Sequence, residues 1–306
     1  MRVTSLYQRE AGRSDIKRRC RTPLETLKER IKHLKQKRPG MGAILDFYQK
    51  VREAQEQAKA SLKCEPLLLK KEWKAFLAKQ GFPLLEKKDF PLDIDVSFSL
   101  FQSLCRIGRE ANPRMADEIK KTEEAIFIKK MDLKRVLRES RCKGKIEQSA
   151  DDLGFDRKIF QFLIENAIRP SIEAAVEQLR NEFDVKDWTR GYCPMCGSLP
   201  FLSLMKEETG KRYLLCSYCG YQWRINRLIC PFCNNNDHES LHYFYGEGEE
   251  SFRIDLCDQC HQYIKTIDLR NTTGSDLCLE DLSTLHLDFL ASQKGYQRPT
   301  PTVWTI

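Results

Sequence analysis

Eight of the thirteen cysteines in this chain fall into four C-x2-C pairs, and all four pairs lie after residue 190. A C-x2-C pair places two sulfur atoms on one tight turn, where backbone amides can donate hydrogen bonds to them. Two such turns complete a tetrahedral site for zinc or iron. The chemistry expected of these residues is therefore metal binding by thiolates, and the candidate ligands are Cys193, Cys196, Cys216, Cys219, Cys230, Cys233, Cys257 and Cys260.

The separations between successive pairs indicate which pairs share a metal ion. They are 19, 10 and 23 intervening residues. A separation of 19 residues allows one β-hairpin between two metal-binding turns, so each site can form from neighbouring segments. We therefore predict that the first pair joins the second and that the third joins the fourth. The alternative is an interleaved cross-brace, in which the ten-residue link would connect turns of different sites.

The residues that follow the cysteine pairs predict the shape of the turns. Gly197 and Gly220 follow the two pairs of the first site, where a positive φ lets the backbone approach sulfur. Asn234 and His261 stand at the equivalent positions of the second site, and both residue types adopt positive φ more often than most. We expect the same turns at both sites, with slightly more strain at the second.

The predicted sites are closed, because the protein supplies all four ligands to each ion. A catalytic metal would need an open coordination position, so the expected role is to hold together two subdomains with small cores. Thioredoxin-like disulfide exchange is disfavoured, since it uses a single C-x2-C beside a helix. With eight cysteines available, His238, His242 and His261 are expected to be surface residues or neighbours of the sites.

The remaining candidates for chemistry are weaker. Isolated cysteines are usually buried as small apolar residues, and this is expected of Cys20, Cys64, Cys105, Cys142 and Cys278. No spacing places two of the carboxylates Asp268, Asp281 and Asp288 around one substrate, and Asp281 is expected to begin a C-terminal helix. The sequence contains neither a Gly-rich phosphate loop nor a G-x-S-x-G turn. We predict that the protein is not an enzyme.

Residues 1–187 are expected to form a helical domain, because they contain no cysteine pair and their apolar residues recur every three or four positions. Residues 188–306 contain all four pairs, many aromatic residues and frequent turn residues. The spacing predicts helices over 24–34, 43–62, 70–79, 97–109, 114–130 and 157–183. Pro170 should kink or divide the last of these helices.

The composition is that of a soluble globular protein, with 41% hydrophobic and 31% charged residues. The apolar runs are too short to span a bilayer, and the first twenty residues lack the apolar stretch of a secretory signal. Thirteen cysteines in a reducing compartment indicate metal ligation better than a disulfide framework. These features predict a cytoplasmic protein.

Charge is distributed unevenly along the chain. Residues 1–190 contain 42 Lys and Arg against 30 Asp and Glu, whereas residues 191–306 contain 10 against 14. Four-cysteine ribbons that bind nucleic acid are expected to carry basic residues around their metal-binding turns, and here that region is acidic. Nucleic acid is therefore not the expected partner. The segment with Trp223, Arg224 and Arg227 is expected to join the two metal units, and the alternative is that it faces a partner.

Four segments resemble the FdhE family of formate dehydrogenase accessory proteins. They are GYCPMCGSLP (191–200), RYLLCSYCGYQWRINRLICPFC (212–233), FRIDLCDQCHQYIKTIDL (252–269) and EDLSTLHLDFLASQKGYQR (280–298). The resemblance implies a multidomain α+β fold with three parts. These are an all-α N-terminal domain over 1–187, a rubredoxin-like (zinc-ribbon-like) domain over 188–228, and a second such domain with a C-terminal helix over 229–306.

The same resemblance implies that the two four-cysteine sites hold iron, with zinc as the other possibility. It implies an accessory role in the maturation of formate dehydrogenase, with that enzyme's catalytic subunit as the partner. Two alternatives remain, namely a zinc-ribbon nucleic-acid-binding protein and a rubredoxin-like electron-transfer protein. The second of these requires a ferric/ferrous couple, which zinc does not provide.

Overall fold

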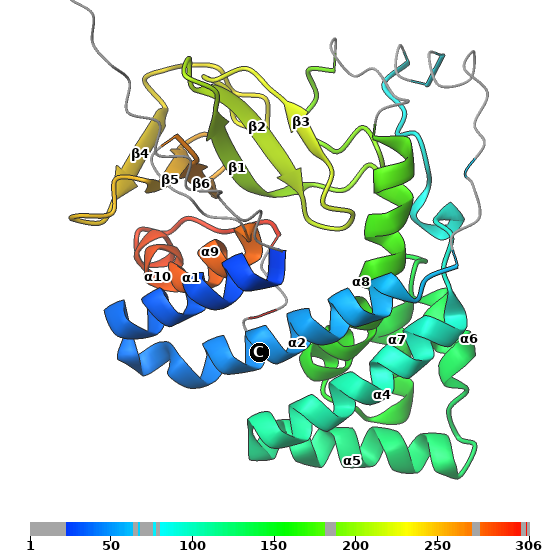
Figure 1. Cartoon of the computed structure of the whole chain (residues 1–306). Helices are drawn as coiled ribbons and strands as arrows, with labels where there is room; N and C mark the ends of the chain where they lie inside the picture. The colour runs from blue at the N-terminus through cyan, green and yellow to red at the C-terminus, as the bar shows by residue number, and fades with distance from the viewer. Residues whose placement is uncertain are drawn as a thin grey trace, which may run out of the picture.

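Helices and strands occupy different parts of the chain. The computed structural model describes residues 23–63, 67, 76–77, 80–180, 188–270, 276–300 and 304. A helical part precedes a sheet part that contains both four-cysteine groups, and two short helices near the C-terminus lie between them (Figure 1). This arrangement confirms the predicted α+β fold class. None of the described helices combines the length and the apolar content that crossing a bilayer would require.

The helices of the first part begin at polar caps. The side chains of Asp93, Asn112, Asp132 and Asp156 each accept a hydrogen bond from a backbone N–H in the first turn of the helix that follows. The described α-helices before the sheet are α1 (Pro23–Lys37), α2 (Gly42–Ala60), α4 (Ile94–Ala111), α5 (Pro113–Phe127), α6 (Leu133–Glu139), α7 (Lys145–Leu153) and α8 (Arg157–Leu179).

The predictions for these helices have mixed outcomes. The helices predicted over 24–34, 43–62, 97–109 and 114–130 are confirmed as α1, α2, α4 and α5. The short helices α6 and α7 were not predicted, because each spans nine residues or fewer. Most of the predicted helix over 70–79 lies outside the described residues.

Pro170 was expected to kink or divide the last predicted helix, and it does not divide it, because α8 continues through this residue. Pro170 has no N–H to donate to the carbonyl of Asn166, which lies one turn earlier. The buried side chain of Gln55 in α2 donates to that carbonyl instead, with an Nε2–O distance of 3.1 Å. A neighbouring helix thus supplies the hydrogen bond that proline removes.

The six described strands form one sheet. They are β1 (Pro200–Lys206), β2 (Lys211–Cys216), β3 (Gln222–Arg224), β4 (Leu241–Tyr245), β5 (Phe252–Cys257) and β6 (Gln262–Asp268), and their order is β3-β2-β1-β6-β5-β4. All neighbours are antiparallel except β1 and β6, which pair in parallel. The sheet therefore consists of two three-stranded halves with the same strand order, placed one after the other.

Arg212 in β2 joins the two halves of the sheet. Its guanidinium is almost completely buried and donates to the backbone carbonyls of Arg227 (3.2 Å) and Ile229 (2.8 Å) in the connecting segment. It also pairs with Asp255 in β5 at 3.2 Å. The connecting segment was expected to make this joint with its own side chains, but the side chain of Arg227 is exposed and only its carbonyl takes part.

Helices α9 (Leu277–Ser283) and α10 (Leu285–Gln293) lie between the sheet and helices α1 and α2 (Figure 1). Arg30 in α1 donates two hydrogen bonds to the buried Glu280 in α9, at 2.6 and 2.7 Å. The hydroxyl of Tyr48 in α2 donates to Asp276 at 2.6 Å. Helices α1 and α2 are therefore joined to α9 and its N-cap, although more than 200 residues separate them in the sequence.

Two carboxylates of these helices converge on one buried cation. The ammonium of Lys265 in β6 lies 2.9 Å from Asp281 and 2.6 Å from Asp288, and Arg298 contacts both carboxylates. Burial would raise the pKa of Asp281, but Arg298 and Lys265 lower this pKa below its ordinary value. The cluster is an internal ion network in which two cations neutralise two anions.

This cluster brings together two carboxylates from different helices and corrects one prediction about them. Asp281 and Asp288 meet at the ammonium of Lys265. Asp281 was expected to begin the C-terminal helix, but it lies inside α9. The helix begins at Asp276, whose side chain accepts hydrogen bonds from the amides of Cys278 and Leu279.

Candidate metal centres

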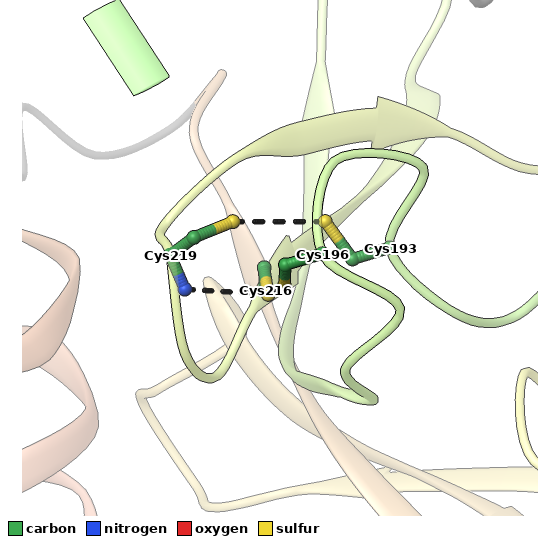
Figure 2. A group of neighbouring side chains, drawn as sticks. All are labelled: Cys193, Cys196, Cys216 and Cys219. Carbon is green, nitrogen blue, oxygen red and sulfur yellow. Dashed lines mark hydrogen bonds between the residues drawn. The ribbon is translucent and has the colours of Figure 1, made fainter. Parts of the chain in front are cut away.

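The first cluster is formed by the turn before β1 and the turn that joins β2 to β3. Figure 2 shows the side chains of Cys193, Cys196, Cys216 and Cys219 converging from these two turns. The sulfur of Cys193 lies 3.7 Å from that of Cys219, and the sulfur of Cys196 lies 3.4 Å from that of Cys216. The amide of Cys219 donates to the sulfur of Cys216 at 3.5 Å.

The second cluster repeats this arrangement with the turn before β4 and the turn that joins β5 to β6. It contains Cys230, Cys233, Cys257 and Cys260. The cross-turn distances are 3.7 Å between the sulfurs of Cys230 and Cys260, and 3.6 Å between those of Cys233 and Cys257. The structure therefore groups the pairs sequentially, and an interleaved cross-brace is not the arrangement observed.

The residues that follow the pairs adopt the predicted backbone conformation. The φ angles are 74° at Gly197 and 69° at Gly220, and they are 61° at Asn234 and 52° at His261. The first turn of each site also has the same hydrogen bonds, since Gly197 donates to the carbonyl of Cys193 and Asn234 donates to that of Cys230. The second site holds its turns with two non-glycine residues in the left-handed region, where most side chains are disfavoured.

The sulfur spacing fits a tetrahedral metal ion. A metal–sulfur bond of about 2.3 Å gives sulfur–sulfur separations of about 3.8 Å at the corners of a tetrahedron. The four cross-turn distances of 3.4–3.7 Å lie close to this value. They are far longer than the roughly 2.05 Å of a disulfide bond. Within each cluster all four sulfurs lie within 4.8 Å of one another, so each cluster can hold one ion.

The electrostatics of the first cluster also favour a cation. Burial raises the pKa of Cys193 and Cys219 well above the ordinary value for a thiol. Hydrogen bonds from the neighbouring sulfurs lower the pKa of Cys196. Four thiolates so close together and so far from water need compensating positive charge, which a bound metal ion would supply.

The two clusters differ in how deeply they are buried. All four cysteines of the first cluster are buried, whereas Cys233 and Cys260 of the second are partly exposed. The helical part covers the first cluster, because the amides of Leu84 and Leu85 donate to the carbonyls of Pro194 and Met195 in its first turn, at 2.8 and 2.9 Å. The first cluster is therefore part of the main hydrophobic core, and the second lies outside it.

Each half of the sheet is preceded by a metal-binding turn, and the backbones of these two turns are in contact. A Cβ atom placed on Gly191 would lie 1.7 Å from the carbonyl oxygen of Pro231. Glycine is thus required at position 191 by a close approach between the segment before Cys193 and the turn of Cys230. This requirement was not predicted from the sequence, because nothing in the spacing of the pairs indicates that the turns meet.

The other candidate residues lie outside the clusters. The histidines His238, His242 and His261 are exposed, and His242 pairs with Asp258 at 3.0 Å. Cys105 is buried as expected, and burial raises its pKa to about 12. Cys142 is exposed, so its predicted burial is wrong, and Cys278 is half-buried with its sulfur 3.8 Å from Arg169. Cys20 and Cys64 lie outside the described residues.

Gly220 offers a test of the turn conformation. It has a φ of 69°, and a Cβ atom built there would meet nothing within 4 Å. The Gly220→Ala substitution should therefore act through backbone strain alone and lower the free energy of unfolding by about 1–2 kcal/mol. The Gly220→Asn variant should lose less, because Asn tolerates this region better. Denaturant titration of the metal-loaded proteins measures both changes, and equal losses would contradict the strain explanation.

Comparison with known proteins points to a single family. Two family models match the sheet part, namely "FdhE, central domain" over residues 192–227 and "FdhE, C-terminal domain" over residues 228–304. A protein FdhE homolog of Aquifex aeolicus (strain VF5) is 26% identical over 271 residues, which cover 87% of this chain and 90% of that protein. The protein FdhE of Escherichia coli (strain K12 / DH10B) is 34% identical over 112 residues, 36% of each chain.

The fold is also that of a solved structure. The crystal structure of the FdhE protein from Pseudomonas aeruginosa matches with a TM-score of 0.67 and covers 92% of this chain and 95% of that one. The sequence identity over this match is 21%, so the likeness concerns the fold. It extends over the helical part, where the family models have no match.

Proposed function

We propose that this chain is a member of the FdhE family and that it acts in the cytoplasm by binding the catalytic subunit of a formate dehydrogenase while that enzyme matures. Membership of this family supports an accessory role for formate dehydrogenase. The proposal goes further in two respects: it names the catalytic subunit as the partner and the cytoplasm as the compartment. It also assigns the formate chemistry to the partner, so that the protein itself is not an enzyme.

The observation that carries the metal part of the proposal is the pair of four-sulfur clusters with tetrahedral spacing. We propose that the first cluster, Cys193, Cys196, Cys216 and Cys219, holds one iron ion. The second cluster, Cys230, Cys233, Cys257 and Cys260, would hold another. A thiolate-bound iron ion can cycle between ferric and ferrous states, whereas zinc in the same ligands would be purely structural. We propose three domains: the helical domain over 1–187, the domain of the first cluster over 188–228 and the domain of the second cluster over 229–306.

The test of the proposed role is a strain from which the gene has been deleted. We expect formate dehydrogenase activity to be lost while its catalytic subunit is still synthesised, because the defect lies in maturation. A plasmid carrying the gene should restore activity, and the catalytic subunit should co-purify with a tagged copy of the protein. An unrelated oxidoreductase of the same strain serves as the control and should keep its activity.

The outcome that would contradict this role is full formate dehydrogenase activity in the deletion strain. The metal is tested separately, by anaerobic purification, metal analysis and the visible spectrum after exposure to air. Two iron ions per chain with a ferric-thiolate absorption band would support iron. Two zinc ions would contradict iron and leave the accessory role to be decided by the deletion strain.

A further inference from the structure

Strand β4 forms one edge of the sheet, as Figure 1 shows, and pairs with β5 on one side. The amide of Asp258 donates to the carbonyl of Ser240 just before the strand, which fixes the alternation of hydrogen bonds along the pair. His242 and Phe244 therefore direct their backbone groups towards β5. The N–H and C=O groups of Tyr243 and Tyr245 point the other way, and no partner is found for them among the described residues.

The side chains on this edge are suited to a protein contact. Tyr243 and Tyr245 are 61% and 49% exposed, and their rings stack with centroids 6.4 Å apart. The guanidinium of Arg253 lies over the ring of Tyr243, 5.0 Å from its centroid. A cavity of about 70 Å³ adjoins the edge, and its lining combines apolar residues such as Leu228 and Phe232 with charged ones such as Arg227. Exposed Tyr side chains with a neighbouring Arg are typical of binding surfaces.

The segments on either side of β4 are acidic, whereas Arg253 and Arg227 lie beside the strand itself. Residues 234–252 contain five Asp and Glu and no Lys or Arg. Asp237 and Glu239 lie before β4 and Glu247 and Glu250 after it, and all four are exposed. The fifth, Glu249, is already paired with Arg38 and His286. Both ends of the open edge are therefore flanked by carboxylates.

This distribution argues against a second copy of the chain at the same edge. If two β4 strands paired antiparallel about Tyr243, Glu239 of one copy would lie opposite Glu247 of the other. Like charges placed directly opposite each other destabilise such a pair. A segment with Lys or Arg near its ends would meet carboxylates instead.

We propose that β4 is a docking edge, to which an extended basic segment of a partner protein adds as a further strand. The backbone of the segment pairs with the outward N–H and C=O groups of Tyr243 and Tyr245. Its apolar side chains pack against the two rings, and its basic side chains lie near the flanking carboxylates. This mode of binding gives affinity through main-chain hydrogen bonds and specificity through side chains. Identifying the partner as the enzyme's catalytic subunit rests on the proposed function.

The test uses the metal-loaded full-length protein and a fluorescein-labelled nine-residue peptide of alternating Lys and Val. Fluorescence anisotropy should show saturable binding that weakens as salt is added. The matched peptide of alternating Glu and Val should not bind. Methylating the backbone nitrogens on the pairing side of the basic peptide should weaken binding at least tenfold, and methylating those on the other side should have little effect.

Substitutions at Tyr243 locate the binding to the edge. The Tyr243→Pro variant removes the outward N–H and keeps the ladder to β5, because position 243 does not donate to that strand. The Tyr243→Thr variant removes the ring and keeps the N–H. We expect the proline variant to bind at least tenfold more weakly than the threonine variant. Metal content and circular dichroism confirm that both variants are folded.

Three results would overturn the proposal: equal binding by the two variants, equal binding of the acidic peptide, or a dimer in light scattering that Tyr243→Pro abolishes. The assay contains no formate dehydrogenase, so its failure contradicts the docking edge alone. Normal enzyme maturation in the deletion strain would contradict the proposed function alone.

Discussion

Replacing Cys193 and Cys196 together by Ser is expected to reduce the metal content from two ions per chain to one. The two clusters share no ligand, and all ligands of the second come from residues 230–260. The free energy of unfolding should fall steeply as well, because structural zinc sites contribute about 10–16 kcal/mol in small peptides. The loss should be larger than for the Cys230→Ser and Cys233→Ser pair, since the first cluster belongs to the main core.

Metal analysis of the purified variants measures the first effect, and denaturant titration measures the second. The control is Cys142→Ser, which removes an exposed cysteine outside both clusters and should keep both ions. A folded Cys193→Ser and Cys196→Ser variant without any metal would contradict two independent sites. So would a variant that still binds two ions.

A strong chelator in excess is expected to remove the metal ions in two phases of one ion each. The second cluster should lose its ion first, because Cys233 and Cys260 are partly exposed whereas the first cluster is fully buried. Release from the first cluster requires the helical part to open, since Leu84 and Leu85 are hydrogen-bonded to its first turn. Opening of such buried regions approaches the free energy of global unfolding. We expect the two rates to differ at least tenfold.

Stopped-flow absorbance with a chromogenic chelator follows both phases, and the variants assign them. The Cys230→Ser and Cys233→Ser protein should lack the fast phase, and the Cys193→Ser and Cys196→Ser protein should lack the slow one. If the fast phase instead disappears with the first cluster, the order of burial does not govern metal release. A single phase releasing both ions would lead to the same conclusion.

The parts of the site that could be predicted are those encoded within a few residues of each other. A C-x2-C pair and the residue after it fix one turn, so the sequential grouping of the cysteines and the positive φ at Asn234 and His261 followed from the sequence. The amphipathic helices followed for the same reason. Their periodicity is a property of each segment alone.

The parts that could not be predicted depend on contacts between distant segments. Lys265, Asp281 and Arg298 come from a strand, a helix and the chain that follows, and nothing in their spacing shows that one buried network contains them. The role of Arg212 is hidden in the same way, because the three partners that join it to the other half of the sheet lie 15 and more residues away and include backbone carbonyls. A distant contact also decides that Pro170 does not divide α8, since another helix supplies the missing hydrogen bond.

The contact between α1 and α9 has a consequence for the order in which the chain can fold. Arg30 and Glu280 are separated by 250 residues, so this pair cannot form on the ribosome until nearly the whole chain has been synthesised. Contacts of such long range slow folding and leave apolar surface exposed in the meantime. The ligands of the first cluster emerge some sixty residues before Glu280, with the last of them at Cys219. Nascent chains could therefore bind their first metal ion before α1 and α2 pack against α9 and α10.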